Sequence, residues 1–252
     1  MCLVLFAYRP DSEQPLVVAA NRDEFYARPA QSAHHWEDHP DLLAGRDLSA
    51  GGTWLGVTRS GRFATVTNFA EEGPSEAPLS RGALTSAFLQ SASSAQDFAR
   101  HLHGLHYRGF NLLLWDGTEL VYTSNRGFTE VLAPGIYGLA NAELGASWPK
   151  VVSGRAALAS VLEPRPSIDA LLQVLGDRSV PADDELPRRG RPLELERRVA
   201  PRFIAGEDYG TRASTALIVQ RGRIEFAEQL YGPRGVPGER AEFAFATGRQ
   251  DA

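Results

Sequence analysis

The only cysteine of this 252-residue chain is Cys2, which directly follows Met1. Aminopeptidases that remove the initiator methionine accept a small second residue, so we expect a mature chain that begins at Cys2 with a free α-amine. A thiol and an α-amine have reference pKa values of about 8.5 and 7.7–8.0, so such an amine can accept the thiol proton near neutral pH. Nucleophile and base would then belong to one residue. The alternative is a small apolar residue at the start of a buried strand.

Four polar residues, Asn21-Arg22-Asp23-Glu24, come directly after the apolar residues 16–20. Charged groups cannot stay in a core without partners, so we expect this segment at the edge of a sheet, close to the first strand. A carboxylate there could fix the ammonium or thiol of Cys2, and an arginine could hold a substrate carboxylate or lower a thiol pKa. The alternative is a solvated turn with a local Arg–Asp pair.

Two asparagines, Asn68 and Asn141, each end a segment with strand character. A neutral amide can donate a hydrogen bond to a developing oxyanion without competing for protons. The commoner role of asparagine is that of a turn residue, and this alternative stays open for both.

The elements that must position these residues begin with two apolar runs, residues 3–8 and 16–20. Their apolar residues are consecutive, which is typical of strands buried on both faces of a sheet. Further strands are predicted over residues 53–58, 63–68, 111–115, 119–122, 136–141, 214–220, 223–231 and 241–246. Helices are predicted after Ser80 and Ser94, which could cap them, and over residues 148–162 and 168–175. Hairpins with helices grouped in the middle favour a layered α+β fold.

Two segments lack regular periodicity. Residues 25–50 are rich in His, Asp and Pro, and we expect a long surface loop. Residues 181–202 are dense in Pro, Arg and Glu, and we interpret them as an irregular excursion within one domain spanning residues 1–252, because the 50 residues that follow are too few for a second domain.

The composition excludes several classes of protein. The net charge of −5 gives no support for binding nucleic acid, and one cysteine cannot form an internal disulfide or a multi-cysteine metal site. No segment has the pattern of an export signal or the length of a transmembrane helix, so we expect a cytoplasmic protein.

His34, His35 and His39 lie in the irregular segment, and we expect no metal site there. Trp36 with His34 or His35 could face a flat apolar ligand such as haem.

Several segments together resemble the NRDE family, the family of transport and Golgi organisation protein 2. They run in the expected order over residues 1 to about 231: the Met-Cys start, Asn-Arg-Asp-Glu at 21–24, Gly-Gly-Thr-Trp-Leu-Gly at 51–56, Thr-Asn-Phe at 67–69, Gly-Leu-Ala-Asn-Ala at 138–142, Trp-Pro-Lys-Val at 148–151 and Tyr-Gly-Thr-Arg-Ala-Ser-Thr at 209–215. The start and the two asparagine segments also resemble, more distantly, the choloylglycine hydrolases and penicillin acylases.

The resemblance implies an N-terminal-nucleophile fold, a four-layer αββα sandwich of two antiparallel sheets between helical layers. It implies catalytic positions for Cys2 as nucleophile, for Asp23 as the residue that holds the terminal amine, and for Asn68 and Asn141 on the oxyanion side. Ligand-binding positions fall on Asn21, Arg22, Glu24 and Arg212. The acylases separate their arginine and aspartate by two residues, whereas Arg22 and Asp23 are adjacent, so their roles could be exchanged with those of Asn21 and Glu24.

Two functions follow as hypotheses. The first is an enzyme without a required cofactor, in which Cys2 hydrolyses a linear amide or thioester of a small amphipathic substrate. The second is a carrier of haem, acyl-CoA or lipid, because the family is linked to haem trafficking and lipid metabolism. The residues alone leave both open.

Overall fold

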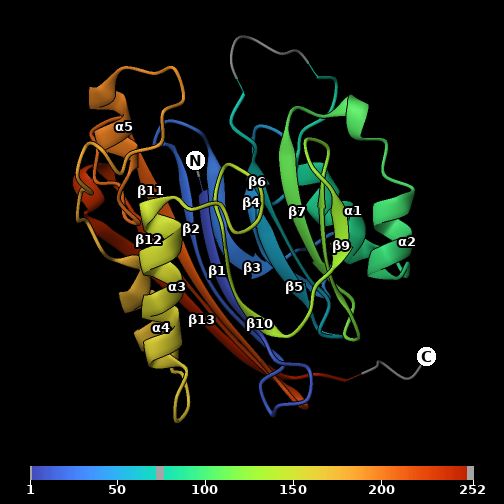
Figure 1. Cartoon of the computed structure of the whole chain (residues 1–252). Helices are drawn as coiled ribbons and strands as arrows, with labels where there is room; N and C mark the ends of the chain where they lie inside the picture. The colour runs from blue at the N-terminus through green and yellow to red at the C-terminus, as the bar shows by residue number, and fades with distance from the viewer. Residues whose placement is uncertain (1, 72–76, 249–252) are drawn as a thin grey trace.

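Two antiparallel sheets form the centre of the computed structural model, which describes residues 2–71 and 77–248 (Figure 1). The first sheet has the strand order β10 (Gly135–Leu139), β1 (Cys2–Tyr8), β2 (Leu16–Phe25), β11 (Tyr209–Gln220), β12 (Arg223–Tyr231) and β13 (Pro237–Ala246). The second has the order β3 (Ala30–His35), β4 (Leu42–Asp47), β5 (Leu55–Thr58), β6 (Phe63–Asn68), β7 (Phe110–Trp115), β8 (Leu120–Ser124) and β9 (Thr129–Val131).

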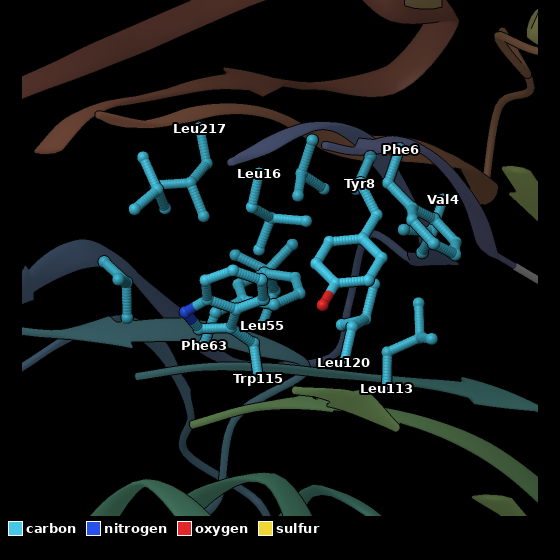
Figure 2. Packing of buried hydrophobic residues seen from close by; sticks show 14 of the residues in the cluster. Val4, Phe6, Tyr8, Leu16, Leu55, Phe63, Leu113, Trp115, Leu120 and Leu217 are labelled. Carbon is cyan, nitrogen blue, oxygen red and sulfur yellow. The ribbon is translucent and has the colours of Figure 1, made fainter. Parts of the chain in front are cut away.

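The largest apolar cluster fills the space between the two sheets (Figure 2). Alternate residues of β1, Val4 and Phe6 among them, point from the first sheet toward Phe63 and Trp115 of the second. The other residues of β1 point the opposite way, because successive side chains of a strand face opposite sides of the sheet. β1 is therefore buried on both faces, as its unbroken apolar run predicts.

Helices cover the outer face of each sheet (Figure 1). The helices are α1 (Gly82–Gln90), α2 (Ala95–Arg100), α3 (Pro149–Val161), α4 (Ile168–Leu175) and α5 (Leu193–Val199). Leu3 and Leu5 of β1 pack with Val151 of α3 and Leu171 of α4. On the second sheet, residues of β6 and β7 pack with α1 and α2 in a third cluster. The predicted four-layer α+β sandwich is therefore confirmed.

The predicted surface loop over residues 25–50 is wrong, since β3 and β4 lie within it. Trp36 is buried there and donates from Nε1 to the carbonyl of Ala44 at 3.1 Å, so its indole belongs to the core and not to a ligand-facing loop. His35 packs against Phe243 and Phe245. These two strands contain many polar residues, which find their partners in other parts of the chain. A prediction based on apolar runs therefore misses them.

Other boundaries differ less. The N-cap of helix α1 is Arg81 and not Ser80, and no side-chain hydrogen bond is made at this cap. Ser94 does cap α2, accepting from the Asp97 N–H at 3.1 Å. The predicted irregular excursion over residues 181–202 contains α5. None of the helices in the described ranges is both long and apolar enough to cross a membrane.

Candidate functional site

The pairing of β1 with β2 places Cys2 directly opposite Arg22. Residues paired in this way present their side chains on the same face of a sheet. The Arg22 guanidinium lies on the face toward the second sheet, 4.1 Å from the ring centre of Trp54, with Nη2 3.5 Å from Oδ2 of Asp47. Cys2 itself is half-buried. The Cys2 side chain therefore points to the face of the first sheet that is turned toward the second sheet.

Trp54 is fixed by a close approach to the backbone of β4. A methyl group at Gly45 would lie 2.3 Å from the Trp54 ring, so only glycine leaves room for the indole. Asp47, two residues further along the same strand, also accepts from Nε of Arg28 at 2.7 Å. The Gly-Gly-Thr-Trp segment and the end of β4 thus hold Arg22 in place by stacking and by charge.

Asp23 is the next residue of β2, and it is 4% exposed. Its Oδ1 accepts a hydrogen bond from the Thr211 hydroxyl at 2.8 Å, and its carbonyl accepts one from the Tyr209 hydroxyl at 3.2 Å. Burial raises the pKa of Asp23, while the positive charges of the chain's amino terminus and of Lys150 act in the opposite direction. Asp23 is thus a buried carboxylate whose ionised form is supported by the Thr211 hydroxyl and by the charge of Lys150.

Lys150, in the first turn of α3, is only 4% exposed and donates from Nζ to the carbonyl of Val199 at 3.2 Å. Burial lowers the pKa of Lys150, and the negative charges of Asp23 and Cys2 oppose that effect. In the sequence, Lys150 appears only as part of the Trp-Pro-Lys-Val motif, which assigns it no role. The available signal was the position of the chain's only lysine beside a predicted helix start.

Asn68 and Asn141 lie together, although 73 residues separate them. Nδ2 of Asn141 donates to the carbonyl of Asn68 at 2.7 Å, and the carbonyl of Asn141 accepts from the Ala70 N–H at 2.7 Å. An amide nitrogen has two N–H donors, so this bond leaves Asn141 a second one. Asn141 is buried, whereas Asn68 lines the cavity that contains Cys2.

That cavity has a volume of about 120 Å³ and collects residues from both sheets and from the start of α1. Its lining is strongly charged and consists of Cys2, Arg22, Asp23, Glu24, Arg28, Asp47, Thr53, Trp54, Val66, Asn68, Ser80, Arg81 and Gly82. Arg81 is a site residue that sequence reasoning missed, because an arginine before a helix has no distinguishing pattern. Burial lowers the pKa of Arg81, as does Arg108, and the negative charge of Cys2 opposes them.

The expectation that the Asn-Arg-Asp-Glu segment lies at a sheet edge is wrong. It belongs to β2, between β1 and β11, and Asn21 is 1% exposed. Asn21 faces the helices: Nδ2 donates to the carbonyls of Leu175 and Arg202 at 3.1 and 2.7 Å, and Oδ1 accepts from the Ser214 hydroxyl at 2.6 Å. These bonds use both donors of the amide, and Asn21 does not line the cavity.

The two remaining predicted residues differ in placement. Glu24 lines the cavity, with Oε2 3.9 Å from Nε of Arg28. Arg212 does not, because its Nη1 donates to the carbonyls of Phe25, at 3.4 Å, and Arg28. It lies at a bulge in β11 and ties that strand to the end of β2. Across residues 2–71 and 77–248, no three His, Cys, Asp or Glu side chains are arranged to hold a metal ion.

Comparisons with known proteins agree on a family and on a fold. The family model "Transport and Golgi organisation 2" matches residues 1–233. A Transport and Golgi organization protein 2 homolog of Bos taurus is 36% identical over 257 residues, which cover 91% of this chain and 92% of the relative. The C2A mutant of the conjugated bile acid hydrolase of Clostridium perfringens superposes with a TM-score of 0.53 at 9% identity, over 96% of this chain and 92% of that one.

A second solved structure is the Caenorhabditis elegans ortholog of N-acylethanolamine-hydrolyzing acid amidase. Its TM-score is 0.50 at 10% identity, with 86% of this chain and 92% of that chain covered. At such low identities these likenesses concern the fold alone, which is that of the N-terminal-nucleophile hydrolases.

Proposed function

This chain belongs to the transport and Golgi organisation 2 family, and from that premise we propose that it hydrolyses a linear amide or thioester, with Cys2 as nucleophile once Met1 has been removed. One observation supports this proposal above the others. Cys2 opens the first strand inside a charged cavity that Arg22, Asp23 and Asn68 also line. A cysteine that served only to pack an apolar core would be surrounded by apolar side chains and not by charged ones.

In this mechanism the α-amine of Cys2 accepts the thiol proton, and the thiolate attacks the carbonyl carbon of the substrate. A C–S bond forms, and the carbonyl oxygen becomes an oxyanion that accepts from the amide of Asn68. When the C–N or C–S bond of the substrate breaks, the leaving group takes the proton from the α-ammonium. Water then hydrolyses the acyl-cysteine, releasing a carboxylic acid and regenerating the thiol.

Asp23 is given the role of holding the terminal ammonium. Its carboxylate is buried, and Thr211 orients it by a hydrogen bond. A buried negative charge stabilises the ammonium that forms when the thiol loses its proton. The amine would thereby be positioned for both proton transfers. Asn141 acts through Asn68, whose carbonyl it binds.

The amide is the first choice of substrate bond, because two structural neighbours are named as hydrolases of conjugated bile acids and of N-acylethanolamines. The carriage of haem or acyl-CoA stays a prediction from the family resemblance. The cavity beside Cys2, at about 120 Å³, is smaller than the 300–1,000 Å³ typical of sites that enclose a drug-sized ligand.

The test is a hydrolysis screen with N-acyl amides and acyl thioesters of increasing chain length. The Cys2→Ala variant is expected to lose at least about 1000-fold in kcat, as other enzymes do without their nucleophile. Ser160→Ala, an exposed hydroxyl on α3, is the control and is expected to match the parent protein. Hydrolysis that survives in Cys2→Ala would contradict the mechanism.

A further inference from the structure

Three arginines line the cavity beside Cys2, and their ion pairs differ. Arg22 lies 3.5 Å from Asp47. Arg28 lies 2.7 Å from Asp47 and 3.9 Å from Glu24. Arg81 has no ion pair with a carboxylate among residues 2–71 and 77–248, and it donates from Nη1 to the carbonyl of Gly109 at 3.2 Å. Within the described chain, Arg81 is thus the cavity arginine without a carboxylate at ion-pair distance, although Glu71 and Glu24 act on its charge from further away.

The backbone that carries Arg81 is held firmly against the second sheet. A methyl group at Gly52 would lie 2.4 Å from the carbonyl carbon of Gly82, so the two glycines are packed backbone to backbone. The Thr53 N–H donates to the carbonyl of Gly82 at 3.2 Å. The backbone at Arg81 is therefore already ordered before a ligand binds. This reduces the conformational entropy that the protein loses on binding.

Cys2 and Arg81 line the same small cavity and interact electrostatically. A guanidinium presents a planar fork of donors that matches a carboxylate, and charge-assisted bonds of this kind are about twice as strong as neutral ones. A cavity of about 120 Å³ has room for a short acidic group but not for a long acyl chain.

We propose that Arg81 binds a carboxylate of the substrate next to the bond that Cys2 attacks. This inference rests on the proposed hydrolysis and names its substrate class: acyl compounds whose short leaving group carries a carboxylate, such as N-acyl amino acids. The acyl chain would extend out of the cavity, while Arg81 fixes the acidic end and so places the scissile carbonyl at the thiol.

A test that needs no substrate uses the single cysteine of the chain. Iodoacetate and iodoacetamide alkylate a thiol by the same displacement of iodide and differ in carrying a carboxylate or a neutral amide. The rate with each reagent is measured by intact mass and normalised to its rate with N-acetylcysteine. The ratio of the two normalised rates cancels any change in thiolate fraction and reports attraction of the carboxylate alone.

We expect Arg81→Gln to lower the iodoacetate-to-iodoacetamide ratio about tenfold, the effect of one hydrogen bond to a charged group. Arg81→Lys keeps the charge and is expected to retain most of the ratio, which separates loss of charge from loss of folding. The control is Arg221→Gln, whose side chain is 63% exposed and does not line the cavity. It is expected to match the parent protein.

The outcomes separate the two proposals. An Arg81→Gln ratio equal to that of the parent protein overturns the carboxylate site, even if Cys2-dependent hydrolysis of neutral amides is found. A ratio that falls in Arg81→Gln, in a protein that hydrolyses none of the compounds screened, upholds the carboxylate site and removes the hydrolysis. Where hydrolysis is found, N-octanoylglycine should be preferred about tenfold over N-octanoylglycinamide in the parent protein, and the preference should disappear in Arg81→Gln.

Discussion

The four residues from Asn21 to Glu24 divide between the two faces of β2. Arg22 stacks on Trp54, on the side of the second sheet, whereas Asn21 binds the backbone of Leu175 on the helical side. This alternation explains how a fully polar segment is tolerated in a central strand. Its groups have partners, and those of Asn21 are 154 to 193 residues away along the chain.

These distant partners are also the reason why the sequence could predict only part of the site. The identity of Cys2, Asp23 and Asn68 as candidates follows from their types and from a family resemblance. The prediction that this segment lies at a sheet edge is wrong. It follows from the rule that buried charges need partners, but that rule does not reveal partners that lie far away in the sequence. Arg81 and Lys150 become site residues only when the chain is folded.

At Asp23, replacement by Asn removes the charge that we propose holds the terminal ammonium, while keeping the size of the side chain. We expect kcat for amide hydrolysis to fall by about 100-fold with KM changed less than threefold, the size of effect seen when one stabilising group is lost from an active site. Steady-state kinetics checks this. Asp169→Asn, at an aspartate that is 70% exposed, is the matched control, and equal losses in both variants would contradict the role of Asp23.

At Lys150, replacement by Met removes a buried cation that lowers the pKa of Asp23. The pKa of Asp23 is then expected to rise. In the proposed mechanism Asp23 must be ionised to hold the ammonium, so the acidic limb of the kcat–pH profile should move to higher pH. Lys150→Arg keeps the charge and should restore the parent profile. Identical acidic limbs in the parent protein and Lys150→Met would show that the two residues are not coupled.

Among the elements, strands with unbroken apolar runs were predicted well, and strands made of mixed residues were missed. β1 matches its prediction because both of its faces are buried. β3 contains two histidines, and its register with β4 shifts between Gln31 and His34, so neither period nor composition marks it as a strand. Its place is fixed by contacts across the sheets, among them a hydrogen bond from the Ala33 N–H to Oε1 of Glu228 at 2.7 Å.

Glu228 of β12 gives this inter-sheet contact a dependence on pH. The side chain is 1% exposed, and burial raises the pKa of Glu228 to about 7, from a reference value of 4.5. Between pH 4.5 and 7 the unfolded chain releases this proton while the folded chain keeps it, so the free energy of unfolding falls as pH rises. Above pH 7 both states are ionised and the loss is complete, at about 3 kcal/mol from 1.36 kcal/mol per pKa unit.

Glu228→Gln keeps the hydrogen bond from Ala33 and has no proton to release. Its stability relative to the parent protein is expected to increase by about 3 kcal/mol between pH 4.5 and pH 8. Urea unfolding at the two pH values measures this difference. Glu225→Gln, on the same strand and partly exposed, should show no comparable change. Parallel stability curves for Glu228→Gln and the parent protein would refute the buried, protonated state.

At the scale of the whole molecule, the site lies where the ends of both sheets meet, so its geometry depends on the core that joins them. The excursion over residues 181–202 also reaches the site, because Val199 accepts the hydrogen bond of Lys150. The family match spans this segment as well. A stretch with little pattern of its own thus supports the lysine whose charge acts on Asp23.

Leu16 is fully buried in the inter-sheet core, and Leu16→Ala is expected to lower the free energy of unfolding by about 2–5 kcal/mol. Leu105 is 94% exposed, and the chemically identical change Leu105→Ala should cost less than about 0.5 kcal/mol. Urea unfolding of both variants provides the comparison. Equal costs at the two positions would be inconsistent with a core between the sheets.

The central claim is that Cys2 becomes an N-terminal nucleophile, and the most direct test is intact mass spectrometry of the purified chain before and after a brief exposure to a slowly hydrolysed N-acyl amide. We expect a mature mass without Met1, and a transient increase equal to one acyl group that is absent in Cys2→Ala. A chain that retains Met1, or an acyl adduct that persists in Cys2→Ala, would contradict the account.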